Sequence, residues 1–351
     1  MPTAPATLRY ADHRLDEAQE ALADVFSTFF ERECPVERVR AAEPGGFDAA
    51  LWGQLVDMAA PAMGVPEEAG GDGAGLADLV LVTEPLGRRL APVPLVEVSA
   101  AARLLARCGP PATDTLAAAL DGRHLVTLAL HPGRPGQPQL VPAGAVADAV
   151  VALVGDELVL VTGTGRPAAN HGDTPIAWWD LDGTAGSRTV LATGDEARRL
   201  VAGAVSEWKL LTAAALVGLA DQATRIAIEH ARTRTAFGAP IGTFQAVSHA
   251  LVDVHMDTET ARRLVRKAAW FADREPGTDG HRIPMAYLHA AETAMRAGTV
   301  GVHVLGGMGF TLEADEQLYF RRAKGWTLVA GDPRAELAAI ADALYGPPTT
   351  R

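Results

Sequence analysis

The sequence predicts an α+β fold that is mostly α-helical, with a small β region between two helical regions. Apolar residues recur at helical spacing toward both ends of the chain. Short β-rich runs, separated by Gly, Pro and Asp, fill the middle. The expected domains are an N-terminal helical domain over residues 1–109, a shortened middle β domain over 110–200 and a C-terminal four-helix bundle over 201–351.

The N-terminal region reads as a set of helices. Over residues 15–30, apolar residues repeat every three or four positions, with Asp and Glu on the opposite face. Asp48 is a suitable N-cap for a helix over 49–58. After a loop rich in Gly and Pro, two more helices are expected over 76–90 and 98–107, and short helices of this kind pack as a bundle.

The middle region changes to strand-like patterns. Residues 149–154 and 158–162 flank Gly155-Asp156-Glu157, which predicts a β-hairpin. Further strands are expected over 124–130 and 187–191, and Trp178 and Trp179 precede a turn.

The C-terminal region predicts long helices. The first is expected over 206–230, the second over 243–272 with Thr243 as its N-cap, and the last over 333–344. Pro284 opens a third helix, which ends before Gly306.

The connection between the first two of these helices, residues 231–245, has the composition of a ligand-binding loop. It holds the breakers Gly238 and Pro240, an exposed Phe237 and the basic pair Arg232 and Arg234. Arginines where one helix ends, close to backbone N–H groups where the next begins, suit a phosphate-bearing ligand.

The bulk composition excludes several classes of function. The formal net charge is −12, from 31 Lys and Arg against 43 Asp and Glu, whereas a nucleic-acid surface needs clustered cations. Cys34 and Cys108 form neither a metal-type spacing nor a disulfide framework. The first six residues lack the pattern of a signal peptide, and no apolar run approaches about 18–20 residues. We therefore expect a cytoplasmic protein that binds neither nucleic acid nor membrane.

The order of these regions, together with three loops, resembles the acyl-CoA dehydrogenase family over nearly the whole chain. One family segment is Arg-x-x-Phe-Gly with Gln seven residues later, and it stands here as Arg234, Phe237, Gly238 and Gln245. A second, Gly-Gly-x-Gly-Phe, stands at residues 306–310. The third, residues 66–71, is similar to the family loop that approaches the acyl pocket. Three matches in the family order are far more specific than one.

The resemblance implies FAD as the cofactor and an acyl-CoA as the substrate. In the family, the arginine segment reaches across a subunit interface to the FAD, and the glycine loop lines its adenine-diphosphate part. The implied cofactor-binding residues are Arg234, Phe237, Gly238, Gln245, His303, Gly306, Gly307 and Gly309. A guanidinium suits a pyrophosphate because it presents a planar fork of donors, and glycine lets the backbone approach a flat ring. Taken singly, Arg234 fits a solvated helix end, Gly306 a helix C-cap and His303 an ordinary helix histidine.

The sequence departs from the family where the chemistry takes place. The family removes a proton and a hydride from an acyl thioester, usually with a Glu before a Gly as the base, and Ala330 occupies that position here. Other members carry the base early in the first bundle helix, where Trp208 stands. Glu207 and Asp332 are weak substitutes: Glu207 fits an exposed charge near a helix start, and Asp332 has a shorter arm. The usual Thr-Glu-Pro-x-x-Gly-Ser stretch and the tryptophan-containing strand over the flavin are not found between 110 and 200.

Two hypotheses follow. In the first, the chain is an FAD-dependent acyl-CoA dehydrogenase with an unrecognised base, either alone or as one subunit of a hetero-oligomer. In the second, it is a non-catalytic subunit that completes the FAD site of a catalytic partner. Both imply a homo- or hetero-oligomer with another chain of the family, and neither identifies the electron acceptor. The histidines share no ligand-type spacing, so no metal is expected.

Overall fold

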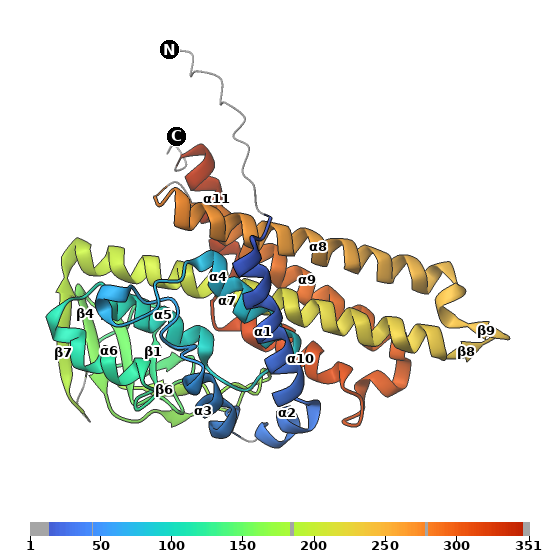
Figure 1. The fold of residues 1–351 in the computed structure, drawn as a ribbon, viewed down its shortest axis with the longest axis horizontal. Helices are drawn as coiled ribbons and strands as arrows, with labels where there is room; N and C mark the ends of the chain where they lie inside the picture. Colours follow the sequence, from blue (N-terminus) through green and yellow to red (C-terminus); the bar gives the residue numbers. More distant parts are fainter. Residues whose placement is uncertain (1–13, 44, 183–185, 278–279, 347–351) are drawn as a thin grey trace, which may run out of the picture.

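The computed structural model describes residues 14–43, 45–182, 186–277 and 280–346, and the first six residues used above lie outside these ranges. An α+β fold dominated by helices is observed, as predicted (Figure 1). The N-terminal helices are α1 (Glu17–Glu33), α2 (Val36–Ala42), α3 (Ala49–Asp57), α4 (Leu76–Arg88), α5 (Leu95–Ala106) and α6 (Thr113–Leu120). Asp48 caps α3 as expected, because its side chain accepts a hydrogen bond from the Leu51 amide.

Two small sheets form the β region. The first has the order β1-β3-β4-β7, with β1 (Val126–Leu128) parallel to β3 (Ala149–Val154) and the other pairs antiparallel. The predicted hairpin is confirmed as β3 and β4 (Glu157–Thr162), and β7 covers Arg188–Thr193. The second sheet has the order β2-β6-β5, with β2 at Gln139–Val141, β5 at Arg166–Pro167 and β6 at Ala177–Trp179.

The structure qualifies one expectation for this region, namely that no tryptophan-containing strand is found there. Trp178 and Trp179 belong to strand β6, so the middle region does contain a tryptophan-bearing strand. Trp179 is buried between the sheets, where its indole N–H donates to the Gly144 carbonyl at 2.8 Å, and Trp178 is partly exposed. The strand is only three residues long, which is why its alternation of buried and exposed positions is not recognisable from sequence.

The C-terminal bundle is built on α7 (Gly194–Thr233), a helix of 40 residues and about 60 Å. It contacts α8 (Gln245–Arg274), α9 (Arg282–Leu305) and α10 (Glu316–Leu328), and α11 (Pro333–Tyr345) packs on α9. The helix begins 12 residues before the expected start, so the predicted boundary at residues 200 and 201 falls inside it. The domain limits therefore stay a prediction.

The helix α7 is central to the hydrophobic core. It crosses α4 so closely that a Cβ on Gly87 or Gly218 would overlap the backbone of the other helix. By length and composition α7 could also cross a membrane, but 72% of its apolar window is buried inside the protein, which is the arrangement of a core helix.

Candidate functional site

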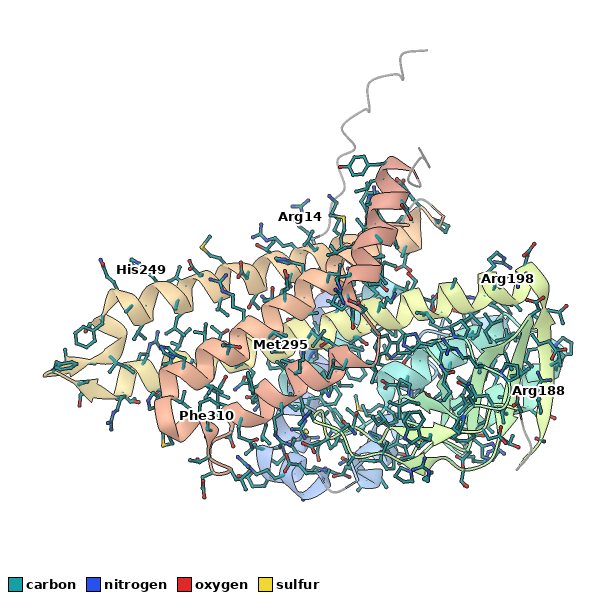
Figure 2. All side chains as sticks on the ribbon, turned by 180° about the vertical axis from the view of Figure 1, so that it is seen from behind. Arg14, Arg188, Arg198, His249, Met295 and Phe310 are labelled. Carbon is teal, nitrogen blue, oxygen red and sulfur yellow. The ribbon has the colours of Figure 1, made fainter. Side chains whose placement is uncertain are left out.

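The predicted cofactor segments lie together at one end of the bundle. Ala231 of α7, Leu251 of α8 and Val304 of α9 share a small hydrophobic cluster, which places residues 231–245 beside residues 303–310. We call these two segments the bundle end. In Figure 2, Phe310 and His249 lie toward this end, whereas Arg188 and Arg198 lie at the opposite end near the sheets.

The tip of the bundle end is a tight β-hairpin that exposes an aromatic ring. Strands β8 (Thr235–Ala236) and β9 (Ala239–Pro240) are joined by Phe237 and Gly238, whose φ angles are +51° and +82°. A two-residue hairpin turn commonly requires positive φ at both positions, and Gly adopts it without strain. A residue with a Cβ, such as Phe237, is strained there. Its side chain is 99% exposed, and its ring forms a T-shaped pair with that of Phe244, at 6.2 Å between centroids. Strained residues of this kind cluster at functional sites.

The basic side chains beside the tip are available to a ligand. Arg232 and Arg234 are exposed, and neither makes an ion pair with another residue that the structure describes. Gln245 is the first residue of α8 and is also exposed. Thr243 was expected to cap this helix but does not, because it lies in a 3-10 turn over Ile241–Thr243 and its hydroxyl donates to the Pro240 carbonyl at 2.7 Å.

The glycine loop following α9 divides into an open and a packed part. Gly306 ends α9 with a φ of +64°, so the helix-cap role considered above is real. A Cβ on Gly306 or Gly307 would meet nothing within 4 Å, whereas one on Gly309 would come within 2.7 Å of the Val302 carbonyl. The first two glycines therefore present open backbone, and Gly309 serves the packing of the loop. His303 is exposed on the last turn of α9.

The two candidate bases are engaged in ion pairs. Glu207 is buried in the interior of α7, so its interpretation as an exposed charge near a helix start was wrong. It pairs with Arg103 of α5 at 2.8 Å and with Arg107, the residue that follows this helix. Asp332 is exposed and caps α11, and its hydrogen bonds to the side chain and amide of Arg334 lower its pKa. The Asp332 carboxylate, stabilised in its charged form, is therefore a poor proton acceptor, and the Glu207 carboxylate is occupied by two arginines.

The space near the expected base position is limited. A central cavity of about 80 Å³ is walled by Trp208 of α7 and by Arg322 and Trp326 of α10, and Trp208 also borders a polar pocket of about 280 Å³ beside Ala330. Clefts for drug-sized ligands usually hold about 300–1,000 Å³. Lys209 and Glu336 form an ion pair in the polar pocket and occupy part of its wall.

A loop of the β region closes the central cavity on one side. Gly172 packs directly on Gly325 of α10, where a Cβ on Gly325 would overlap the Gly172 backbone. Asn170 shapes this loop by accepting hydrogen bonds from the amides of Gly172 at 3.0 Å and Thr174 at 3.2 Å. The loop and α10 therefore meet backbone to backbone at this point, and a flat ring cannot lie between Gly172 and Gly325.

One carboxyl that lines the central cavity is not recognisable from sequence. Glu97 of α5 lines the cavity and accepts a hydrogen bond from the Trp208 indole at 3.3 Å. Burial raises its pKa. Among the residues that the structure describes, no group of three or more His, Cys, Asp or Glu side chains could hold a metal ion. The expectation of a metal-free protein stays a prediction.

Comparisons with known proteins agree with this architecture. Residues 16–114 match the acyl-CoA dehydrogenase N-terminal domain, and residues 199–345 match the acyl-CoA dehydrogenase C-terminal domain. The acyl-CoA dehydrogenase IpdE2 of Mycobacterium tuberculosis (strain ATCC 25618 / H37Rv) is 30% identical over 337 residues, which cover 95% of this chain and 99% of the relative.

Two solved structures superpose on nearly the whole chain. A chain of the ChsE4-ChsE5 complex from Mycobacterium tuberculosis does so with a TM-score of 0.85 at 29% identity, covering 97% of this chain and 100% of that chain. A variant of the Tcur3481-Tcur3483 steroid ACAD gives a TM-score of 0.82 at 26% identity, covering 93% of this chain and 98% of that chain. The chain therefore belongs to the acyl-CoA dehydrogenase family.

Proposed function

We propose that this chain is the non-catalytic subunit of a mixed FAD-dependent acyl-CoA dehydrogenase, in which it completes the FAD site of a catalytic partner. The observation that carries the proposal is a contrast between two parts of the chain. The position of the base is Ala330, which borders a polar pocket of about 280 Å³ whose wall includes the Lys209–Glu336 ion pair, and the central cavity that shares Trp208 with this pocket holds only about 80 Å³. The bundle end, in contrast, is open and exposed.

The bundle end offers the chemistry that the adenine-diphosphate part of FAD requires. Arg234 would bind the pyrophosphate, because a guanidinium donates two parallel hydrogen bonds to phosphate oxygens. Phe237 would pack on the adenosine, and the open backbone at Gly306 and Gly307 would lie along it. Gln245 and His303 would donate hydrogen bonds at the rim.

The partner would contribute the base and the acyl pocket. FAD, when bound, accepts the hydride from the β carbon of the acyl thioester. The residues of this chain hold the far end of the cofactor, so their contribution is orientation rather than proton transfer. The hypothesis that this chain is itself the dehydrogenase would require a base, and the ion pairs of Glu207 and the exposure of Asp332 argue against both candidates.

The relatives support a mixed assembly. ChsE4-ChsE5 and Tcur3481-Tcur3483 each carry the names of two chains, and the latter is a steroid ACAD. Steroid-derived acyl-CoA thioesters are therefore the first substrates to test with the assembled complex. We expect the assembly to be a cytoplasmic dimer or tetramer, and the electron acceptor is not identified by the chain.

The visible absorbance spectrum tests the proposal. The chain should be expressed alone and, separately, together with acyl-CoA dehydrogenase chains of the same organism that keep Glu before Gly in the loop after the glycine loop. We expect a colourless protein alone and a flavin spectrum in one of the co-expressed complexes. Stoichiometric FAD in the chain alone, bleached by an acyl-CoA, would refute the proposal.

A further inference from the structure

A single arginine from the N-terminal region holds the turn that follows the glycine loop. Arg40 lies on α2, and its guanidinium donates to the Leu312 carbonyl at 2.5 Å and to the Glu313 carbonyl at 3.3 Å. It also pairs with the Asp315 carboxylate at 2.7 Å. Three acceptors from one four-residue stretch are thus fixed by one side chain, which only the fork of a guanidinium can do.

The turn has little else to fix it. Within the described part of the chain, the other hydrogen bonds that residues 311–315 make join near neighbours, such as the Thr311 amide to Met308 and the Ala314 amide to Thr311. Meanwhile Phe310 and Leu312 are about three-quarters exposed. A segment with exposed apolar side chains and mostly local bonds lies at the low end of local stability.

The helix α2 is itself firmly anchored. Arg38 binds the Asp48 carboxylate through two nitrogens, at 2.5 and 3.0 Å, and donates to the Glu33 carbonyl at 2.9 Å. At the other end of the helix, Glu43 pairs with Arg321 of α10 at 2.5 Å. Figure 1 shows α2 beside the turn that leads into α10. Arg40 therefore projects from a rigid platform.

We infer that Arg40 is a positioning residue for FAD, because it sets the conformation of residues 306–315 at the bundle end. The inference rests on the proposed function and adds a residue that lies outside the bundle and outside the implied cofactor-binding residues. Loss of the guanidinium would free the turn, and the open backbone at Gly306 and Gly307 would no longer be preorganised for the adenine-diphosphate part.

The test compares Arg40→Gln with Arg89→Gln in the FAD-containing complex. Arg89 is a matched control, because its side chain is as exposed as that of Arg40 (29% and 28%) and pairs with one carboxylate, Glu31, away from the turn. We expect Arg40→Gln to accelerate amide hydrogen exchange over residues 306–315 and to raise the FAD dissociation constant about tenfold. Arg89→Gln should change neither quantity.

Two further variants, Arg40→Lys and Arg234→Ala, distinguish a failure of the inference from a failure of the proposed function. Arg40→Lys keeps the charge but cannot reach all three acceptors, so it should resemble Arg40→Gln while folding normally. Faster exchange with unchanged FAD affinity in either Arg40 variant would overturn the inference and leave the proposed function intact. Unchanged FAD affinity in Arg234→Ala would instead overturn the proposed function, and the inference with it.

Discussion

Replacing Phe237 by Asn should separate folding from cofactor binding. The left-handed conformation costs a residue with a Cβ about 1–2 kcal/mol, and Asn adopts it more readily. The ring contact that Phe237 loses, with Phe244 at 6.2 Å, is worth about 0.5–1.5 kcal/mol at most. The relief of backbone strain and the loss of the ring contact nearly cancel. The free energy of unfolding of the isolated chain should therefore change by less than about 1 kcal/mol, and any change should be an increase.

The same substitution should weaken binding much more. The Phe237 side chain is 99% exposed, so its whole apolar surface is available for burial against a ligand or partner. Burial of a Phe side chain is worth about 1.5–3 kcal/mol, which corresponds to about 10- to 150-fold in a dissociation constant. Chemical denaturation measures the free energy of unfolding, and fluorescence titration of the deflavinated complex with FAD measures the dissociation constant.

A control variant makes the result interpretable. Val25→Asn removes another exposed apolar side chain, 53% accessible, from α1, away from the bundle end. It should leave FAD binding unchanged. The reasoning is refuted if Phe237→Asn binds FAD within twofold of the parent complex, or if it destabilises the chain by more than about 2 kcal/mol.

Three other predictions concern buried charges and the base position. Glu207→Ala should destabilise the chain by about 3–5 kcal/mol, because it leaves two arginines without their shared carboxylate; a loss under 1 kcal/mol in denaturation would contradict this. Within the described part of the chain, neither carboxyl oxygen of Glu316 has a hydrogen-bond partner, and burial raises the pKa of this group to about 9. Its carboxyl is therefore neutral in the folded state, and stability should fall as the pH rises from about 4.5 to about 9. Glu316→Gln should remove this slope and stabilise the chain at pH 7 by as much as about 3 kcal/mol, as thermal unfolding across pH would reveal. Ala330→Glu should not create dehydrogenase activity in the chain alone, because the Lys209–Glu336 ion pair lies in the wall of the pocket beside position 330 and the central cavity next to it holds only about 80 Å³; bleaching of added FAD by an acyl-CoA would show otherwise.

The long helices and the hairpin of the β region could be predicted because their sequence patterns are strong. The helix α10 was missed, since three of its buried residues are polar or charged: Glu316, Gln317 and Arg322. These residues hide the apolar periodicity that marks a helix. Phe237 was expected to be exposed from its place in a breaker-rich loop, and the structure confirms it.

The environment of the candidate bases depends on contacts between distant segments. Glu207 meets Arg103 and Arg107, about a hundred residues earlier in the chain, so its burial leaves no local signal. The Arg40 contacts span more than 270 residues and have no sequence pattern either. The assignment of the eight cofactor-binding residues stays a prediction until FAD binding is measured.

The contact between Gly172 and Gly325 bears on how reversible the loss of a catalytic base is. The backbones of these two glycines meet without intervening side chains, and the loop that contains Gly172 forms one wall of the central cavity. On the proposed function, a mutation that restores Glu at position 330 brings no selective advantage, because the space for a substrate is still closed. Enlarging the central cavity would require a change in the loop around Gly172. That change would bring no advantage until Glu is present at position 330. On that proposal each step is neutral or harmful alone, so a division of labour between two subunits would act as an evolutionary ratchet.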